Sequence, residues 1–248
     1  MVNTTAPPRA SFQQSMDALT HAQKSSKGAP AYSRLVNRPL GRVFAAAANA
    51  RGLRPNQVTA ASAACTFSAL VLVAATRATV LTSLVTAALL VVGYALDAAD
   101  GQLARIQGTG SPLGEWLDHT VDAVKAVAVH LAVAINWYRF EDASISLLLI
   151  PIGFLAVDSV MFFVIILNDH LRRLHPPRDG AATRATSSSL LYSLAVIPGD
   201  YGVLCIVFAL GWWHTGFTVA YAAMGAGSAA MLIVGLPRWY RQISSLGH

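Results

Sequence analysis

Residues 83–105, SLVTAALLVVGYALDAADGQLAR, combine a long apolar run with two aspartates and an arginine at its end. An α-helix needs about 20 predominantly apolar residues to cross the hydrocarbon core of a bilayer. Carboxylates carried by such a helix are energetically costly, so they usually mark a functional site. This stretch therefore predicts a membrane-spanning helix with a functional site near one end.

The rest of the sequence also has the composition of a membrane protein. Of its 248 residues, 54% are hydrophobic and only 12% are charged, whereas charged residues make up about a quarter of a typical soluble domain. Six apolar segments lie at about 58–76, 79–104, 112–137, 145–168, 186–213 and 216–236. We therefore expect an all-α integral membrane protein with six transmembrane helices. Pro198-Gly199-Asp200 interrupts the fifth segment, so the crossing there is expected to start near Pro198.

Two further parts are expected before the first span. Residues 1–31 are polar without sustained periodicity and predict a flexible or surface-lying N-terminal arm. Residues 32–248 are expected to form the membrane domain, with spans over about 57–240. An amphipathic helix is expected at about 32–51, with Arg34, Arg38 and Arg42 on one face. This pattern is typical of a helix that lies on an anionic membrane surface. A solvated helix face would produce the same spacing.

The distribution of Lys and Arg predicts the orientation in the membrane. If the N-terminus is cytoplasmic, nearly all basic residues lie on the cytoplasmic side, and only Arg77 and Arg139 lie on the outer side. Basic residues are enriched in cytoplasmic loops, so we expect a multi-pass protein of the cell membrane with both termini and the aspartate-rich site cytoplasmic. The net charge of +6 does not indicate nucleic-acid binding, because the basic residues form no single dense patch.

Four aspartates form the candidate site. Asp97 and Asp100 end the second span, and Asp118 and Asp122 lie early in the third. The short connection makes these helices antiparallel, so the two pairs can face each other at one depth. Carboxylates at such distances repel one another strongly, and bound divalent cations relieve this repulsion. Oxygen-only ligands suit Mg²⁺ or Mn²⁺. Together with the neighbouring small residues and arginine, such a metal site predicts metal-assisted phosphoryl transfer.

Small residues and one arginine accompany the aspartates. Gly101, Ala104 and Gly114 leave space beside the carboxylates, and Arg105 supplies a guanidinium suited to phosphate. Together these positions resemble the signature of the CDP-alcohol phosphotransferase family (also called CDP-alcohol phosphatidyltransferases). The matching residues are Asp97, Asp100, Gly101, Ala104, Arg105, Gly114, Asp118 and Asp122. The segment Arg54–Thr59 similarly resembles the part of the family that precedes the first span and lies near the cytidine.

The resemblance implies a fold, a reaction and roles for individual residues. Members transfer a phosphate-linked group from a CDP-activated alcohol to a second alcohol and release CMP. It implies that Asp97, Asp100 and Asp118 bind metal, and that Asp122 binds the second metal ion and accepts the proton from the acceptor hydroxyl. The implied contacts to the CDP-linked donor come from Asn56, Gly101, Ala104, Arg105 and Gly114.

The sequence leaves the substrates open. CDP-diacylglycerol is the preferred donor, because the site of this fold class opens sideways into lipid. A loose likeness of residues 27–38 to relatives that use soluble donors makes a CDP-polyol, such as CDP-inositol, the alternative. The acceptor could be glycerol phosphate, serine, inositol phosphate or another polyol. A different class, a non-catalytic membrane binding protein or transporter that retains the fold, is the remaining alternative.

Several residues outside the motif have two interpretations. Lys125 continues the stripe of Asp118 and Asp122, so it could contact a substrate phosphate or serve as a counter-ion for Asp122. Arg172 and Arg173 could bind an anionic acceptor, or could simply reflect the cytoplasmic enrichment of basic residues.

Two features concern the spans themselves. Asp158 lies alone in the fourth span and could be functional or could hydrogen-bond a neighbouring helix. The sixth span is rich in Ala, Gly and Ser, which allows close helix approach. We expect a homodimer, although packing within one chain would use the same small residues.

Overall fold

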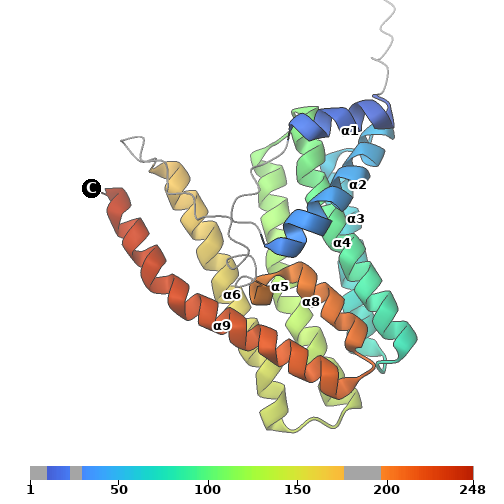
Figure 1. Cartoon of the computed structure of the whole chain (residues 1–248), viewed down its shortest axis with the longest axis vertical. Coiled ribbons are helices and arrows are strands. Elements are labelled where there is room, and N and C mark those ends of the chain that lie inside the picture. Colours follow the sequence, from blue (N-terminus) through green and yellow to red (C-terminus); the bar gives the residue numbers. More distant parts are fainter. Residues whose placement is uncertain (1–9, 23–29, 176–196, 248) are drawn as a thin grey trace, which may run out of the picture.

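The computed structural model describes residues 10–22, 30–175 and 197–247, and these ranges are helical without any strand. Five of the described helices are long and apolar enough to cross a membrane. They are α3 (Pro55–Ala75), α4 (Val80–Gln107), α5 (Pro112–Phe140), α6 (Ile145–Leu174) and α9 (His214–Ser244), and Figure 1 shows them as the body of the molecule. The predicted all-α, multi-pass membrane architecture is therefore confirmed.

The fifth expected span, 186–213, lies only partly within the described residues. A short 3₁₀ turn, Ile197–Gly199, leads into α8 (Tyr201–Val207), which another 3₁₀ turn extends over Phe208–Leu210. The side chain of Asp200 accepts a hydrogen bond from the backbone N–H of Gly202 and so caps α8. This apolar helix is shorter than the other candidate spans, because it begins only after the Pro198-Gly199 interruption. The described residues thus contain five full-length candidate spans rather than six.

The turn between α4 and α5 reverses the chain directly after the first part of the motif. Gly108 ends α4 in the left-handed region, at φ 62°, which glycine adopts without strain. Ser111 then caps α5, because its hydroxyl accepts a hydrogen bond from the backbone N–H of Gly114. Pro112 occupies the first turn of the helix. The antiparallel arrangement of the two motif helices is therefore set by local sequence.

Helix α3 packs against both motif helices, whereas α4 and α5 make no extensive backbone contact with each other among the described residues. Close packing of α3 on α4 depends on Gly93, where a Cβ would lie 2.4 Å from Thr66 Oγ1. The separation of α4 from α5 differs from the expectation that these helices are direct neighbours. It leaves room between their polar faces for long side chains and for ligands.

The N-terminal region contains more structure than expected. A helix, α1 (Phe12–His21), begins with a capping box between Ser11 and Gln14. It contacts α2 and α4, and it buries Leu19 completely among residues of α2, α3 and α4. Residues 12–21 thus form a packed helix within the segment expected as an arm, and the rest of the predicted arm stays a prediction.

The expected amphipathic helix is present as a π-helical segment, Ser33–Asn37, that runs directly into α2 (Arg38–Ala50). Leu35 and Val43 remain exposed on it, as suits a helix at a membrane surface. Gly41 allows α2 to lie against α4, because a Cβ there would be 2.9 Å from Ala98 Cβ. Helix α2 thereby supports the part of α4 that carries the motif.

Asp158, in the fourth span, contacts a histidine of α5. His130 of α5 is completely buried, and its Nε2 lies 3.3 Å from Asp158 Oδ2 of α6. The Nδ1 atom of the same ring lies 2.5 Å from Tyr221 Oη of α9. Of the two interpretations of Asp158, the structure thus shows the helix–helix contact.

The small residues of α9 pack within the chain. A Cβ at Gly227 would lie 2.5 Å from Pro198 Cβ, and Ser228 donates to the carbonyl of Pro198 at 3.0 Å. A Cβ at Gly225 would lie 3.1 Å from the ring of Phe154. The predicted homodimer consequently stays a prediction, since these residues already have intramolecular partners.

Candidate functional site

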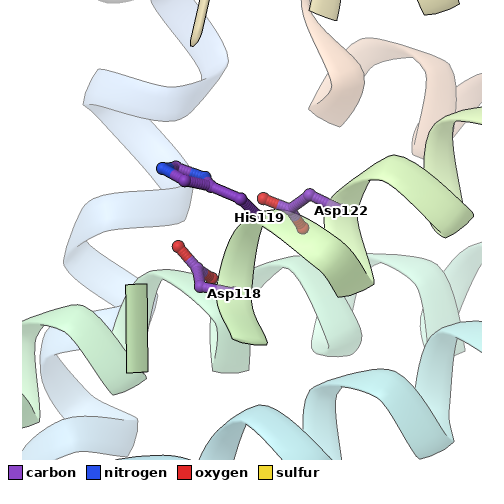
Figure 2. Close-up of side chains that lie close together, drawn as sticks. All are labelled: Asp118, His119 and Asp122. Carbon is purple, nitrogen blue, oxygen red and sulfur yellow. The ribbon is translucent and has the colours of Figure 1, made fainter. Parts of the chain in front are cut away.

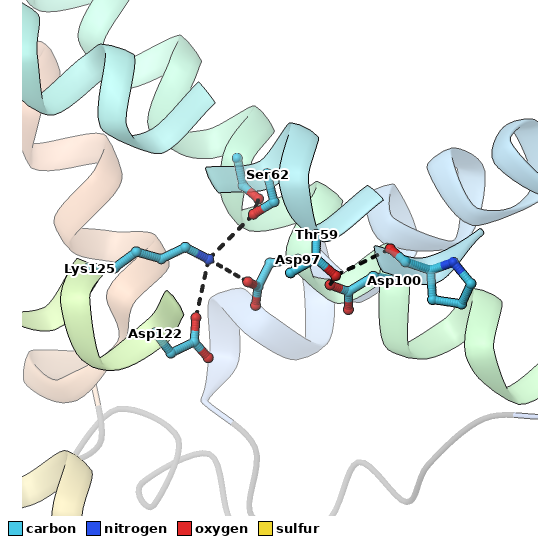
Figure 3. A network of polar contacts seen from close by, with 8 residues as sticks. Thr59, Ser62, Asp97, Asp100, Asp122 and Lys125 are labelled. Carbon is cyan, nitrogen blue, oxygen red and sulfur yellow. Dashed lines mark hydrogen bonds and ion pairs between the residues drawn. The ribbon is translucent and has the colours of Figure 1, made fainter. Parts of the chain in front are cut away.

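Lys125 joins two of the four aspartates. Its Nζ donates to Asp97 Oδ1 at 2.5 Å, to Asp122 Oδ1 at 3.1 Å and to Ser62 Oγ at 3.3 Å. Figure 3 shows the ammonium group between these side chains, which come from α3, α4 and α5. Lys125 itself is only 6% exposed. The contact with Asp122 was one of the two interpretations, whereas the contacts with Asp97 and Ser62 were not anticipated.

Asp100 is held separately, by a hydroxyl of α3. Thr59 Oγ1 donates to Asp100 Oδ2 at 2.5 Å, and both residues are buried. Figure 3 shows this pair beside the Lys125 contacts. The apolar residues that flank Asp100 on α4, Ala99 and Leu103, pack against α1, α2 and α3. The backbone that carries Asp100 is therefore fixed from several sides.

Asp118 and Asp122 project from one stretch of α5 together with His119, as Figure 2 shows. One potential ligand atom from each of these three side chains lies within 4.8 Å of the others. Carboxylate oxygens are the ligands that Mg²⁺ and Mn²⁺ prefer, so Asp118 and Asp122, rather than His119, suit these ions. With Asp97 and Asp100 on the facing helix, the donor set fits divalent metal ions.

A cavity of about 840 Å³ opens beside these aspartates. It contains both buried and exposed polar groups, and it is large enough for a nucleotide-sized ligand. Every residue expected to contact the CDP-linked donor lines it, together with two of the aspartates: Asn56, Asp100, Gly101, Ala104, Arg105, Gly114 and Asp118. Asp97, Asp122 and Lys125 do not line the cavity. They form the hydrogen-bonded network around the Lys125 ammonium group.

The glycines of the motif leave open space toward this cavity. A Cβ at Gly101 would meet only Arg105 Nη1, at 3.6 Å, and a Cβ at Gly114 would lie 3.3 Å from Ser111 Oγ. Neither glycine is required by the φ angle of its backbone or by a tight contact with another helix. The space beside them is therefore part of the cavity.

The two arginines at the end of α6 lie in different surroundings. Arg173 lines the cavity and forms ion pairs with Glu115 at 2.7 Å and with Asp169 at 2.5 Å. Arg172 is not a lining residue, and it donates instead to Gln242 Oε1 of α9 at 2.6 Å. The structure thus brings one of the two expected acceptor-binding arginines to the site.

Sequence reasoning missed several residues of the site. Ser62 lies on α3, where a serine gives no specific signal. Thr59 ends the segment Arg54–Thr59, but no role was predicted for its side chain. Glu115 and Asp169 line the cavity and pair with Arg173. The contacts of Thr59, Ser62 and Glu115 join different helices, so only helix packing reveals them. Asp169 and Arg173 lie four residues apart on α6, so their spacing could have indicated the pair.

The structure thus combines long apolar helices typical of a multi-pass membrane protein with an aspartate cluster and an adjoining polar cavity. Residues 53–223 match the family model for CDP-alcohol phosphatidyltransferase, and the chain belongs to that family. The family transfers a substituted phosphate group from a CDP-alcohol to an acceptor and generally uses divalent metal ions. No curated protein matches the chain.

Proposed function

We propose that this protein transfers a substituted phosphate group from CDP-diacylglycerol to a small alcohol or polyol, which can itself be phosphorylated, and releases CMP. The reaction would belong to the biosynthesis of phospholipids or phosphopolyol lipids and would depend on two Mg²⁺ or Mn²⁺ ions. The cavity that collects the donor-binding motif residues beside Asp100 and Asp118 is the observation that carries this proposal.

The donor diphosphate is proposed to lie beside the aspartates, with Arg105 as its protein-derived positive charge. Arg105 lines the cavity and its Nε donates to the carbonyl of Ala22 at 3.2 Å, which orients the guanidinium. Metal ions held by Asp97, Asp100, Asp118 and Asp122 would neutralise the charge of the diphosphate and of the transition state. The open space at Gly101 and Gly114 would accommodate the nucleotide.

Asp122 is proposed to accept the proton of the acceptor hydroxyl. Its carboxylate keeps 31% of its side-chain surface exposed although it does not line the donor cavity, so a second substrate can reach it without displacing the donor. As the proton moves to Asp122, the acceptor oxygen forms a bond to the β-phosphorus of the donor. The bond between this phosphorus and the bridging oxygen breaks, and CMP leaves with the bonding electrons.

Several features support a cytoplasmic location of this site. Most Lys and Arg residues are expected on the side of the membrane that holds the turn between α4 and α5. Figure 1 shows α1 and the C-terminal end of α9 at the same end of the bundle as the turn between α4 and α5. We therefore propose that both termini and the cavity face the cytoplasm of a cell-membrane protein.

Substrate class is tested by CMP release from purified protein in lipid vesicles. The donors are CDP-diacylglycerol and a soluble CDP-polyol such as CDP-inositol, each combined with glycerol phosphate, serine, inositol phosphate and inositol. Acceptor-dependent CMP release from CDP-diacylglycerol is the expected result. Release only from the soluble donor would replace the proposed donor, and absence of release from every pair would favour a non-catalytic binding protein or transporter.

A further inference from the structure

The binding site of the Lys125 ammonium group is built from three helices. Its acceptors are Ser62 on α3, Asp97 on α4 and Asp122 one turn before it on α5. Lys125 and Ser62 are buried, and the side chain of Asp97 is 19% exposed. A buried ammonium with three acceptors is well satisfied, so its position is defined by the fold rather than by chance contact at the surface.

Ser62 is oriented as an acceptor for this group. Its hydroxyl donates its hydrogen to the carbonyl of Gly93 at 2.8 Å. The lone pairs of the hydroxyl oxygen therefore remain free to accept a hydrogen bond from Lys125. The close approach of α3 to α4 at Gly93 fixes the distance between this hydroxyl and Asp97. The helices thus form a cation site that the chain fills with its own lysine.

Lys125 contacts only one oxygen of each carboxylate, Oδ1 of Asp97 and Oδ1 of Asp122. It does not contact Asp100, which Thr59 holds, and it does not line the donor cavity. These contacts argue against binding of a donor phosphate by Lys125. They place its positive charge at the end of the aspartate cluster that is farther from the cavity.

We propose that Lys125 is a built-in counter-cation that holds Asp97 and Asp122 in place in the metal-free protein and lowers the affinity of the aspartate cluster for divalent metal. The inference rests on the proposed function, because it takes these aspartates as metal ligands. Without the ammonium group, the two neighbouring, partly buried carboxylates repel each other. With it, an incoming divalent cation meets a positive charge beside two of its ligands. Lys125 is therefore a positioning residue rather than a catalytic one.

The test is thermal unfolding of the detergent-solubilised full chain, in EDTA and across a titration with Mg²⁺ or Mn²⁺. For Lys125→Met, we expect a melting temperature roughly 5–10 °C below that of the wild type in EDTA, because a buried pair loses one partner. We also expect the midpoint of the metal titration to fall about tenfold, because a competing positive charge is removed. A structural role in packing alone would lower the melting temperature without lowering that midpoint.

Two variants control for loss of packing. Ser62→Ala removes one acceptor but keeps the charge, so its metal midpoint should stay within about twofold of the wild type. Lys125→Met/Asp122→Asn should regain part of the stability lost in EDTA, because one of the two unpaired carboxylates becomes neutral. If Lys125→Met is unstable without metal, purification in Mn²⁺ followed by chelation allows the same comparison.

The possible failures are distinguishable. A wild type that metal stabilises, combined with an unchanged or higher midpoint in Lys125→Met, would overturn this inference and leave the proposed function intact. A wild type whose melting temperature does not respond to either metal would contradict the proposed metal site and the inference with it. Equal losses of stability in EDTA for Lys125→Met and the double variant would show that the carboxylates are not what Lys125 stabilises.

Discussion

Substitution of Gly101 by alanine should impair binding of the donor in the cavity without lowering the stability of the fold. The new methyl group would lie 3.6 Å from its nearest neighbour, Arg105 Nη1, so no protein atom has to move. Alanine stabilises a helix interior by about 0.5–1 kcal/mol relative to glycine, so the melting temperature should stay the same or rise. The methyl group nevertheless enters the cavity, where crowding of a bound ligand costs about 1–3 kcal/mol.

This range corresponds to a decrease of about 5- to 150-fold in kcat/KM for the CDP-linked donor. The assay is CMP release at varied donor concentration and saturating acceptor, with the melting temperature measured on the same preparation. Gly153→Ala is the matched control, because α6 also has open space at that position, outside the cavity. Gly93→Ala should instead destabilise the protein, since its methyl group would lie 2.4 Å from Thr66 Oγ1. Wild-type kcat/KM in Gly101→Ala would show that the donor does not occupy this cavity.

Three further predictions address the side chains around the site. Thr59→Val removes the hydroxyl that donates to Asp100 and should lower kcat/KM for the donor about tenfold; Thr66→Val, on the same helix, is the control, and equal small effects would remove Thr59 from the site. Arg173→Gln should raise the acceptor KM, whereas Arg172→Gln should not, because Arg173 lies at the cavity edge that also holds Asp118, one helical turn from Asp122; equal KM values would leave both arginines with a topological role. Asp122→Asn should still bind the CDP-linked donor, measured by calorimetry, while kcat falls by about two to four orders of magnitude; near-normal turnover would show that the proton goes elsewhere.

The motif could be placed from the sequence because its residues are local. Helical spacing puts Gly101, Ala104 and Arg105 on one side of α4, and the Gly108 turn returns the chain so that Gly114 and Asp118 face the same cavity. Long apolar runs likewise define the spans without information on packing. These inferences depend only on periodicity and on a short connection.

The partners across helices could not be predicted in the same way. The stripe on α5 indicated the contact of Lys125 with Asp122, but its contacts with Asp97 and Ser62 depend on how α3 packs against both motif helices. Arg172 and Arg173 are adjacent in sequence, yet residues one apart point in directions about 100° apart on a helix. The sequence alone does not determine which of these two arginines faces the cavity.

We propose that metal ions held by the aspartate cluster drive the release of CMP. This proposal is tested most directly by following CMP release from a CDP-linked donor, in the presence of its acceptor, before EDTA addition, after it, and after excess Mg²⁺ or Mn²⁺. We expect release to stop with EDTA and to resume with either metal for the wild type, and to be absent throughout for a folded Asp100→Asn variant. Sustained release by the wild type in EDTA, or by Asp100→Asn at the wild-type rate, would contradict the account.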